Sequence, residues 1–289
     1  MSNLSHLPRN GHAMNISSVP DLSPFRYPGG KTWLVPRIQQ WIASQSARTV
    51  EFFEPFAGGG IISLTVASEQ LADHVTMVEL DSDVAAVWRT ILNGDSKWLV
   101  DRITRFNLTT RTVKVALSRR ARSLRERAFR TILKNRVNRG GILAPGAGRL
   151  KQGENGKGLH SRWYPQTLCK RILDIVSIRD RITFIQGDGL EILRQNAQRT
   201  NALFFIDPPY TAAGKKAGSR LYTRHELDHE NLFRLTAQLS SDFLMTYDDV
   251  GEVRDLALRH GLDMRTITMK NTHHAKMTEL LIGRNLDWV

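Results

Sequence analysis

Asp207, Pro208, Pro209 and Tyr210 follow directly after the apolar run Leu203–Ile206. An apolar run stopped by two prolines predicts a buried strand that ends abruptly. In an open α/β sheet, ligands bind outside the carboxyl ends of the strands. A carboxylate, a carbonyl on a rigid turn and an aromatic ring at such a place suit a planar, polar ligand that carries an amine. A stiff strand-ending turn would contain the same residues, so this pattern alone leaves both interpretations open.

A second group with possible chemistry is a glycine-rich loop between an expected strand and an expected helix. It consists of Glu54, Pro55, Phe56, Ala57, Gly58, Gly59 and Gly60. Glycines there allow the backbone to approach a ligand closely. The spacing is not the G-x-G-x-x-G of nicotinamide enzymes, and the chain has no phosphate-binding G-K-[ST] loop. An acid at the start of such a loop suits a cofactor with an amino-acid end or a positive charge, and a plain strand-to-helix turn remains the alternative.

Acids also end two other expected strands. Glu79 stands where a carboxylate commonly accepts hydrogen bonds from ribose hydroxyls. Asp188 could accept from an adenine amine or simply cap the helix that follows it, and Asp81 is expected to be a helix cap. Upstream, Tyr27, Gly29, Gly30 and Lys31 belong to a turn with charged residues, which by itself predicts a surface turn.

The elements that must position these residues alternate between strand and helix. We expect strands at 49–53, 74–80, 183–186, 202–206 and 243–246, and helices at 60–69, 83–92, 228–239 and 250–260, with a helix opening at 187–189. Residues 264–269 and 278–282 are expected to form a closing antiparallel pair. Strands that alternate with helices indicate βαβ units, and therefore a doubly wound, mostly parallel α/β sheet.

The positive charge of the chain is concentrated in one internal segment. The net charge is +13, and residues 93–170 hold 19 of the 41 Lys and Arg but 4 of the 28 Asp and Glu, which leaves the remaining residues at −2. Such a segregated field suits a polyanion, because Lys and Arg contacts to phosphate dominate affinity for nucleic acids. We therefore expect a flexible tail at 1–20, a catalytic domain formed by 21–92 and 171–289, and a nucleic-acid-binding insert at 93–170.

Within the insert, residues 113–139 place apolar side chains at helical spacing with basic residues on the other faces, which predicts one amphipathic basic helix. The glycine-rich stretch 139–160 is expected to form a loop or hairpin. The residues expected to contact nucleic acid are Arg119, Arg122, Lys134, Arg136, Asn138, Arg139, Arg149 and Lys151.

Taken together, these pieces resemble one family in residues and in order: the S-adenosylmethionine-dependent DNA-adenine-N6 methyltransferases of the Dam type. The resemblance runs from residue 23 to about 282 and includes the acid-glycine loop, the acid-ended strand, the basic insert and Asp-Pro-Pro-Tyr. It implies that Tyr27, Gly29, Gly30 and Lys31 flank the cofactor and that Glu54 to Gly60 wrap its methionine end.

By the same resemblance, Glu79, where the family often has Asp, would hold the ribose, and Asp188 with Leu190 would frame the adenine of the cofactor. Asp207 and the Pro208 carbonyl would take the two hydrogens of the target amine. Tyr210 would stack on a base flipped out of the duplex, because the target atom cannot be reached inside it.

Other activities are left open at this stage. The target could be cytosine N4 or adenine in RNA, and the chain could be a DNA-binding protein on an inert methyltransferase fold. We expect no membrane segment, since no apolar run approaches the ~20 residues that a spanning helix needs. No signal peptide is evident, and Cys169 is the single cysteine, so we expect a cytoplasmic, metal-free monomer of bacterial, phage or plasmid origin.

Overall fold

The computed structural model describes residues 19–27, 29–153, 156–209, 227–270 and 276–289. Within these residues, seven strands form one sheet in the order β3-β2-β1-β4-β5-β7-β6. The strands are β1 (Glu51–Glu54), β2 (His74–Glu79), β3 (Ile182–Gln186), β4 (Ala202–Ile206), β5 (Asp242–Asp248), β6 (Asp263–Lys270) and β7 (Lys276–Gly283). Strands β1 to β5 pair in parallel, and β7 pairs antiparallel with both β5 and β6. The expected doubly wound, mostly parallel sheet with its closing antiparallel pair is confirmed.

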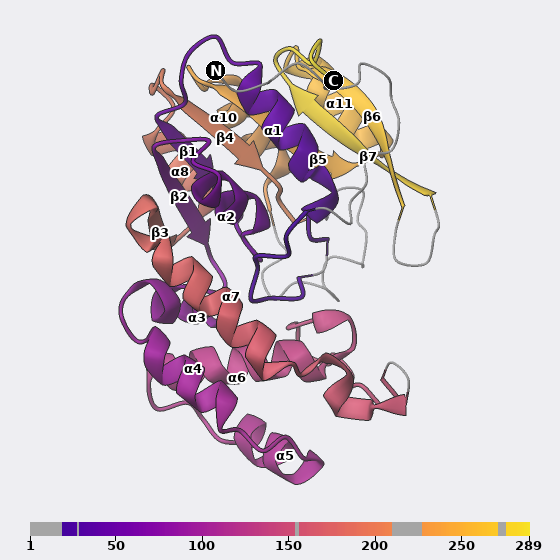
Figure 1. Ribbon diagram of the computed structural model, residues 1–289. Helices are drawn as coiled ribbons and strands as arrows, with labels where there is room; N and C mark the ends of the chain where they lie inside the picture. The colour runs from indigo at the N-terminus through magenta and orange to yellow at the C-terminus, as the bar shows by residue number, and fades with distance from the viewer. Residues whose placement is uncertain (1–18, 28, 154–155, 210–226, 271–275) are drawn as a thin grey trace.

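Helices cover both faces of this sheet (Figure 1). One face carries α1 (Val35–Ala43), α2 (Ile61–Ser68) and α3 (Ser82–Leu92), and the other carries α8 (Gly189–Gln195), α10 (His229–Ala237) and α11 (Gly251–Arg259). The strand β4 is buried along its whole length because helices lie against both of its faces. A parallel strand covered on both sides reads as a continuous apolar run, and the sequence of β4 does so.

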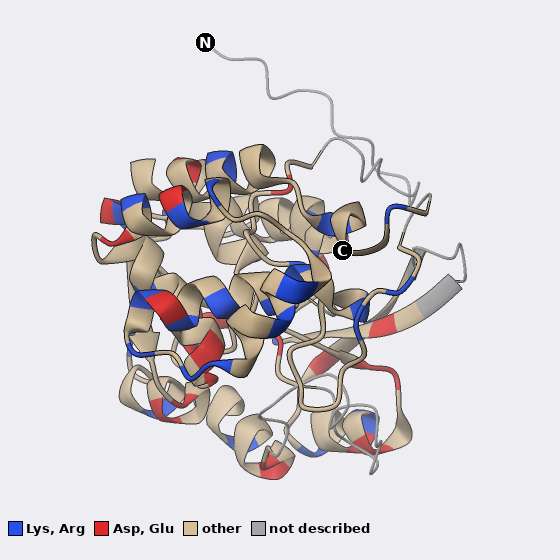
Figure 2. Ribbon diagram, turned by 90° about the horizontal axis from the view of Figure 1, so that it is seen from below, with Lys and Arg blue, Asp and Glu red and all other residues tan. Residues whose placement is uncertain are grey.

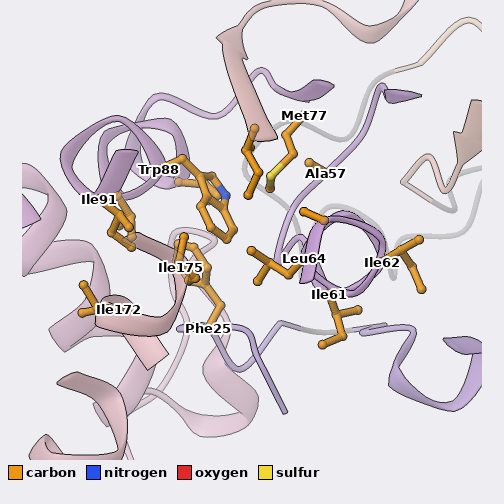
Figure 3. Close-up of a cluster of buried hydrophobic side chains, with 14 of the residues drawn as sticks. Phe25, Ala57, Ile61, Ile62, Leu64, Met77, Trp88, Ile91, Ile172 and Ile175 are labelled. Atoms are coloured by element: carbon orange, nitrogen blue, oxygen red, sulfur yellow. The ribbon is translucent and has the colours of Figure 1, made fainter. Parts of the chain in front are cut away.

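Four further α-helices of the described residues gather below the sheet in Figure 1 and come from the basic segment, residues 93–170, and from the residues that directly follow it. They are α4 (Ser96–Thr104), α5 (Thr110–Ser118), α6 (Leu124–Val137) and α7 (Pro165–Ser177). Their apolar faces share one core with α2 and α3, in which Trp88 contacts residues from several elements (Figure 3). Helices α4 to α7 are therefore packed directly on the sheet and its helices. The predicted boundary at residue 170 falls inside α7, and the division into a catalytic domain and an insert stays a prediction.

The prediction of a single helix over residues 113–139 is wrong. The chain forms α5 and α6 instead, and Arg119, which follows α5, has an extended backbone with φ −78° and ψ 142°. Ser123 then caps α6 by accepting a hydrogen bond from the Glu126 N–H at 3.3 Å, and the Glu126 carboxylate accepts from the Arg122 N–H at 2.7 Å. This Ser-x-x-Glu sequence is typical of a helix start, so a new helix begins here although the helical spacing of the apolar residues continues across the break.

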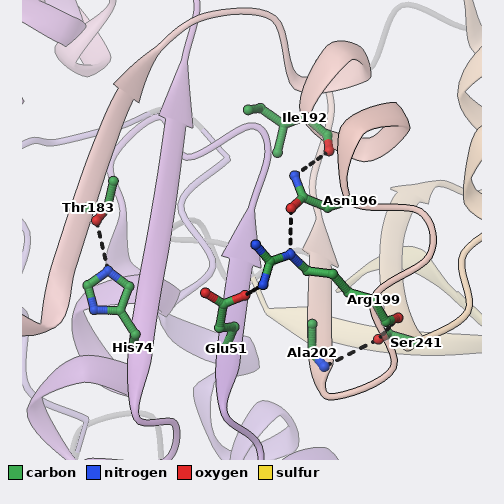
Figure 4. Close-up of polar contacts among 8 residues, drawn as sticks. All are labelled: Glu51, His74, Thr183, Ile192, Asn196, Arg199, Ala202 and Ser241. Carbon is green, nitrogen blue, oxygen red and sulfur yellow. Dashed lines mark hydrogen bonds and ion pairs between the residues drawn. The ribbon is translucent and has the colours of Figure 1, made fainter.

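The glycine-rich stretch after α6, expected to be a loop or hairpin over residues 139–160, begins with a short hairpin-like pairing. Asn138 pairs antiparallel with Arg149, and the Leu150 N–H donates to the Val137 carbonyl at 2.9 Å. At the opposite end of the molecule, the amino ends of the strands are joined by polar contacts (Figure 4). There Arg199 pairs with Glu51, and His74 contacts Thr183 at 2.8 Å.

Candidate active site

The carboxyl ends of β1 and β4 meet where the strand order reverses, between β1 and β4. This is the topological switch point, where open α/β sheets bind their ligands. Glu54 is the last residue of β1, and Asp207 directly follows β4. The two carboxyl groups interact electrostatically, which is one reason why the pKa of Glu54 is raised. The predicted catalytic acid and the predicted cofactor loop are therefore neighbours.

Asp207 is held by two side chains from distant parts of the chain. Its Oδ1 lies 3.0 Å from the Lys31 Nζ and accepts a hydrogen bond from the Thr246 hydroxyl on β5 at 2.7 Å. Lys31 is 3% exposed, and its ammonium also donates to the Gly29 carbonyl at 2.9 Å and lies 3.8 Å from Glu279 on β7. The side chain of Lys31 therefore contacts the acid of the Asp-Pro-Pro-Tyr motif, and the place beside the cofactor that the resemblance implied for Lys31 stays a prediction.

Pro208 is buried and Pro209 is partly buried, and both follow β4 without regular secondary structure. Tyr210 lies outside the described residues, so its expected stacking role stays a prediction. Thr246 and Glu279 were missed by the sequence reasoning. A polar residue inside an otherwise apolar strand is the available signal for both, since Glu279 precedes Leu280–Ile282 and Thr246 follows Phe243–Met245.

Glu54 is the buried acid of the site. Its carboxylate accepts a hydrogen bond from the Ser63 N–H at 3.0 Å, near the start of α2. Burial raises the pKa of Glu54 to about 8; the hydrogen bonds from Ser63 lower it, Asp207 raises it and Lys31 lowers it. A buried acid in this condition takes up a proton near neutral pH unless a positive charge comes close to it.

The glycine loop itself is shaped by close approaches that leave no room for side chains. Gly58 and Gly60 have φ values of +48° and +64°, which favour glycine. A Cβ atom on Gly60 would lie 2.5 Å from the Met77 Cε, and one on Gly58 would lie 2.6 Å from the Tyr27 Cε1. The ring of Tyr27 therefore lies directly against this loop, and Pro55 and Ala57 are buried in it.

Glu79 anchors the same loop. One carboxylate oxygen accepts from the Gly58 N–H at 3.0 Å, and the other accepts from the Asp81 N–H at 2.7 Å. Burial of the carboxyl group raises the pKa of Glu79 to about 7, and its hydrogen bond from Asp81 lowers it. Each carboxylate oxygen has a further lone pair, so Glu79 can still accept from a ligand hydroxyl. Asp81 caps α3 as expected, through the Asp83 and Val84 N–H groups.

Asp188 and Leu190 lie beside this loop. A Cβ atom on Gly189 would be 2.5 Å from the Pro55 carbonyl oxygen and 2.9 Å from the Phe56 ring, so the start of α8 touches the loop closely. Asp188 is exposed and caps α8 by accepting from the Leu190 N–H at 2.9 Å. Asp188 is thus a helix cap, which was one of the two roles considered from the sequence. Its role beside the adenine of the cofactor stays a prediction. Gly29 and Gly30 form an exposed turn next to Lys31.

The residues expected to contact nucleic acid fall into two groups. Exposed side chains belong to Arg119 and Arg122, in the connection between α5 and α6, and to Arg139, Arg149 and Lys151, in the stretch after α6. Lys134 is half-buried, and its ammonium donates to the Leu143 carbonyl at 2.5 Å. Arg136 and Asn138 are only 7% and 3% exposed. Arg136 donates to the Pro24 carbonyl and Asn138 to the Ile142 carbonyl, so the prediction that these two contact DNA does not fit the structure.

Two grooves lined by arginine include Arg119, Arg122 and Arg149 of this exposed group. A groove of about 1490 Å³ runs between α4, α5 and α6, and a smaller one of about 420 Å³ lies between α6 and residues 144–149. Arg102 lies over the rings of Phe129 and Phe106, at 4.8 and 5.5 Å from their centroids. Figure 2 views the molecule from this side, where Lys and Arg recur along the helices.

Two further features concern the part of the chain that the structure describes. None of its helices is long and apolar enough to cross a lipid bilayer. Among the same residues, no group of three or more His, Cys, Asp or Glu is arranged to hold a metal ion.

The sheet order, the switch-point acids and the glycine loop define a Rossmann-like methyltransferase of class I. A model of the D12 class N6 adenine-specific DNA methyltransferases matches residues 27–271, and the chain belongs to this family. It is accordingly an enzyme that methylates adenine in DNA. The match includes Lys31, Glu54, Glu79 and Asp207 and also the whole basic segment.

Comparisons with individual proteins add little to this. A search among curated proteins found no match. Solved structures that resemble the chain include the rRNA methyltransferase aviRa from Streptomyces viridochromogenes, at 12% identity and a TM-score of 0.40, over 89% of this chain and 86% of that one. Another is the M1A22 tRNA methyltransferase TrmK of B. subtilis, at 10% identity and a TM-score of 0.36, over 88% and 68% of the two chains. Likenesses at this level carry no argument about the substrate.

Proposed function

We propose that this enzyme takes the methyl group from S-adenosylmethionine and transfers it to the N6 of an adenine that has been flipped out of duplex DNA at a defined sequence. The observation that carries the proposal is the fixed carboxylate of Asp207 at the end of β4, next to the glycine loop. Two ligands must meet at this switch point, and the chain offers a different set of polar groups for each.

The residues around the loop fit S-adenosylmethionine, which supplies an electrophilic methyl group on a sulfonium centre. Burial raises the pKa of the Glu54 carboxyl group to about 8, so the neutral form of this acid is favoured near neutral pH. The amino group of a methionine moiety would stabilise the charged form of Glu54. The carboxylate of Glu79, at the end of the neighbouring strand, suits the ribose hydroxyls. Because Gly58 and Gly60 have no side chains, the backbone of the loop can approach the cofactor closely.

Asp207 and the carbonyl of Pro208 suit the amine of the target base. The lone pair of an adenine N6 is conjugated with the ring, which makes this nitrogen a poor nucleophile. Two acceptors for its two N–H bonds favour a tetrahedral nitrogen whose lone pair points towards the methyl group. Lys31 and Thr246 hold one oxygen of Asp207, so the carboxylate is oriented before the base arrives, and positioning and electrostatics supply most of the catalysis. Tyr210, by its place in the motif, would stack on the flipped base.

The basic segment has side chains that can bind the phosphates of the DNA duplex. Arginine is the preferred residue for phosphate because its planar guanidinium can form two parallel hydrogen bonds. Seven arginines line the groove between α4, α5 and α6 with one acid, Glu126. The smaller groove continues this surface towards the hairpin residue Arg149. In this proposal, the grooves contact the phosphate backbone of the DNA, and the hairpin at 139–153 contacts its bases. Arg136 and Asn138, which are buried, do not contact DNA.

The test is methyl transfer by the purified chain from labelled S-adenosylmethionine to duplex DNA and to RNA, with identification of the methylated nucleoside. We expect N6-methyladenine in duplex DNA, and expect Asp207→Ala to lose it while still binding DNA. Asp180→Ala, which changes an aspartate whose side chain is 98% exposed, serves as the control. Formation of N4-methylcytosine or methylation confined to RNA would contradict the proposed target, and a chain that binds no S-adenosylmethionine would contradict the proposed cofactor.

A further inference from the structure

The segment Ser23–Tyr27 lies between helix α6 and the glycine loop. On the side of α6, the fully buried Asn135 holds the backbone of Arg26 from both ends of its amide. The Asn135 Oδ1 accepts from the Arg26 N–H at 2.9 Å, and the Asn135 Nδ2 donates to the Arg26 carbonyl at 2.9 Å. The same Nδ2 donates to the Gly141 carbonyl at 2.7 Å, which ties the hairpin to this point.

Further contacts from the basic segment fix the same stretch. Arg136 donates to the Pro24 carbonyl at 2.5 Å, and Arg171 on α7 donates to the Ser23 carbonyl at 3.1 Å. Burial, with Arg171 and Arg26 nearby, lowers the pKa of Arg136 to about 10. A Cβ atom on Gly141 would lie 2.1 Å from the Arg26 carbonyl oxygen, so only glycine fits there.

On its other side, this segment contacts the glycine loop. The Ser23 hydroxyl donates to the Gly59 carbonyl at 2.5 Å, and the Tyr27 side chain covers Gly58 and Gly59. Phe25 packs on Trp88 with 5.8 Å between ring centroids, and the Trp88 Nε1 donates to the Gly58 carbonyl at 3.0 Å. Ser23–Tyr27 is therefore in direct contact both with α6 and with the loop that starts at the carboxyl end of β1.

We propose that Asn135 is a positioning residue for the cofactor, which acts by fixing the Arg26 backbone and thereby the Tyr27 ring against Gly58 and Gly59. This rests on the proposed function, in which that loop binds S-adenosylmethionine. Asn135 lies between Lys134 and Arg136, two residues that were expected to contact nucleic acid, but its side chain is 0% exposed and bonds the Arg26 backbone and the Gly141 carbonyl. An amide is suited to this task because it accepts from one backbone N–H and donates to the neighbouring carbonyls at once.

The test compares the affinity of the full-length chain for S-adenosylmethionine with its affinity for duplex DNA. Asn135→Ala is expected to weaken binding of S-adenosylmethionine about tenfold, through the loss of the buried hydrogen bonds to Arg26. DNA affinity is expected to fall by a smaller factor, because the hydrogen bond from Asn135 to the Gly141 carbonyl also ties the hairpin. Asn196→Ala is the matched control, because the Asn196 side chain lies at the amino ends of the strands and bonds the Ile192 carbonyl of its own helix (Figure 4).

A double-mutant cycle with Tyr27→Leu shows whether Asn135 acts through Tyr27. In that case the double variant binds S-adenosylmethionine no more weakly than Tyr27→Leu alone. Additive losses, or a loss of DNA affinity with unchanged binding of S-adenosylmethionine, would overturn the proposal. A wild-type chain that binds no S-adenosylmethionine refutes the proposed function, whereas unchanged binding in Asn135→Ala refutes the positioning role alone.

A second measurement uses the wild-type chain and therefore does not depend on a variant that folds. Addition of S-adenosylmethionine is expected to slow hydrogen exchange at the amides of Ser23–Tyr27, since the segment and the cofactor would stabilise each other through the loop. Exchange at these amides that is the same with and without the cofactor contradicts the proposal.

Discussion

The ammonium group of Lys31 lies 3.0 Å from the carboxylate of Asp207 and is almost completely buried. This ion pair joins the turn before α1 to the end of β4, and Thr246 completes it from β5. Asp207, the acid that we propose receives the target amine, is thus oriented by residues from two other parts of the chain. Because the donors are in place before the substrate, little reorganisation is needed when the reaction begins.

We predict that Lys31→Met lowers the rate of methyl transfer about a hundredfold, as expected for loss of one preorganised electrostatic contact. Breaking a buried ion pair also costs about 3–5 kcal/mol of stability, so thermal unfolding must be followed in parallel. The measurement is the single-turnover rate at a temperature where the variant is folded. Arg48→Met, at an arginine outside the basic segment whose side chain is 79% exposed, is the control. A Lys31→Met rate equal to that of the wild type would show that Asp207 needs no such support.

The pKa of Glu54, raised to about 8 by burial, makes a prediction for stability. Between the unfolded value near 4.5 and the folded value, the folded state holds a proton that the unfolded state has lost. Stability therefore falls as the pH rises through this window and levels off above it, with a slope of up to about 1.4 kcal/mol per pH unit from this group. Glu54→Gln should remove that part of the slope in denaturant unfolding measured from pH 5 to 8. An unchanged slope would show that Glu54 is ionised in the folded protein throughout.

The same acid predicts a proton change when the cofactor binds. If the amino group of S-adenosylmethionine lies near Glu54, its charge lowers the pKa of Glu54 and a proton is released near pH 7. Titration calorimetry in buffers with different ionisation enthalpies measures the number of protons released. We expect release in the wild type that disappears in Glu54→Gln. Binding without a buffer-dependent heat would place the amino group elsewhere.

Arg119 and Arg136 are a matched pair that separates DNA contact from structural support. Arg119→Ala should weaken DNA binding and reduce the slope of log affinity against log salt by about 0.9, without loss of stability. Arg136→Ala should instead lower the free energy of unfolding by about 1.5–3 kcal/mol, because the buried Arg136 bonds the Pro24 carbonyl. Salt-dependent binding and denaturant unfolding of both variants provide the check, and the reverse pattern would return Arg136 to the DNA interface.

The sheet could be predicted from the sequence because its signals are local. The run Leu203–Ile206, stopped by two prolines, marks a buried strand without knowledge of any other part of the chain. The break between α5 and α6 was missed because the apolar spacing continues across it, although Ser123 and Glu126 carry a local start signal for a helix.

The partners within the site could not be predicted because they are distant in the chain. Nothing near Lys31 in the sequence indicates that its ammonium contacts Asp207. In the same way, Arg136 has the charge and the neighbours of a phosphate-binding residue, and only the packing of Pro24 against α6 makes it a structural one. The sequence shows which charged side chains are present, whereas their contacts depend on which of them are buried when the chain folds.

Sequencing that detects methylated bases, applied to DNA from cells that express the wild-type chain or Asp207→Ala, tests the central claim most directly. We predict N6-methyladenine at one recurring sequence in the wild type and none above background in Asp207→Ala, with both proteins folded and able to bind DNA. Methylation at the same sequence in Asp207→Ala, or its absence in the wild type, would contradict the assignment of Asp207 as the residue that receives the target amine.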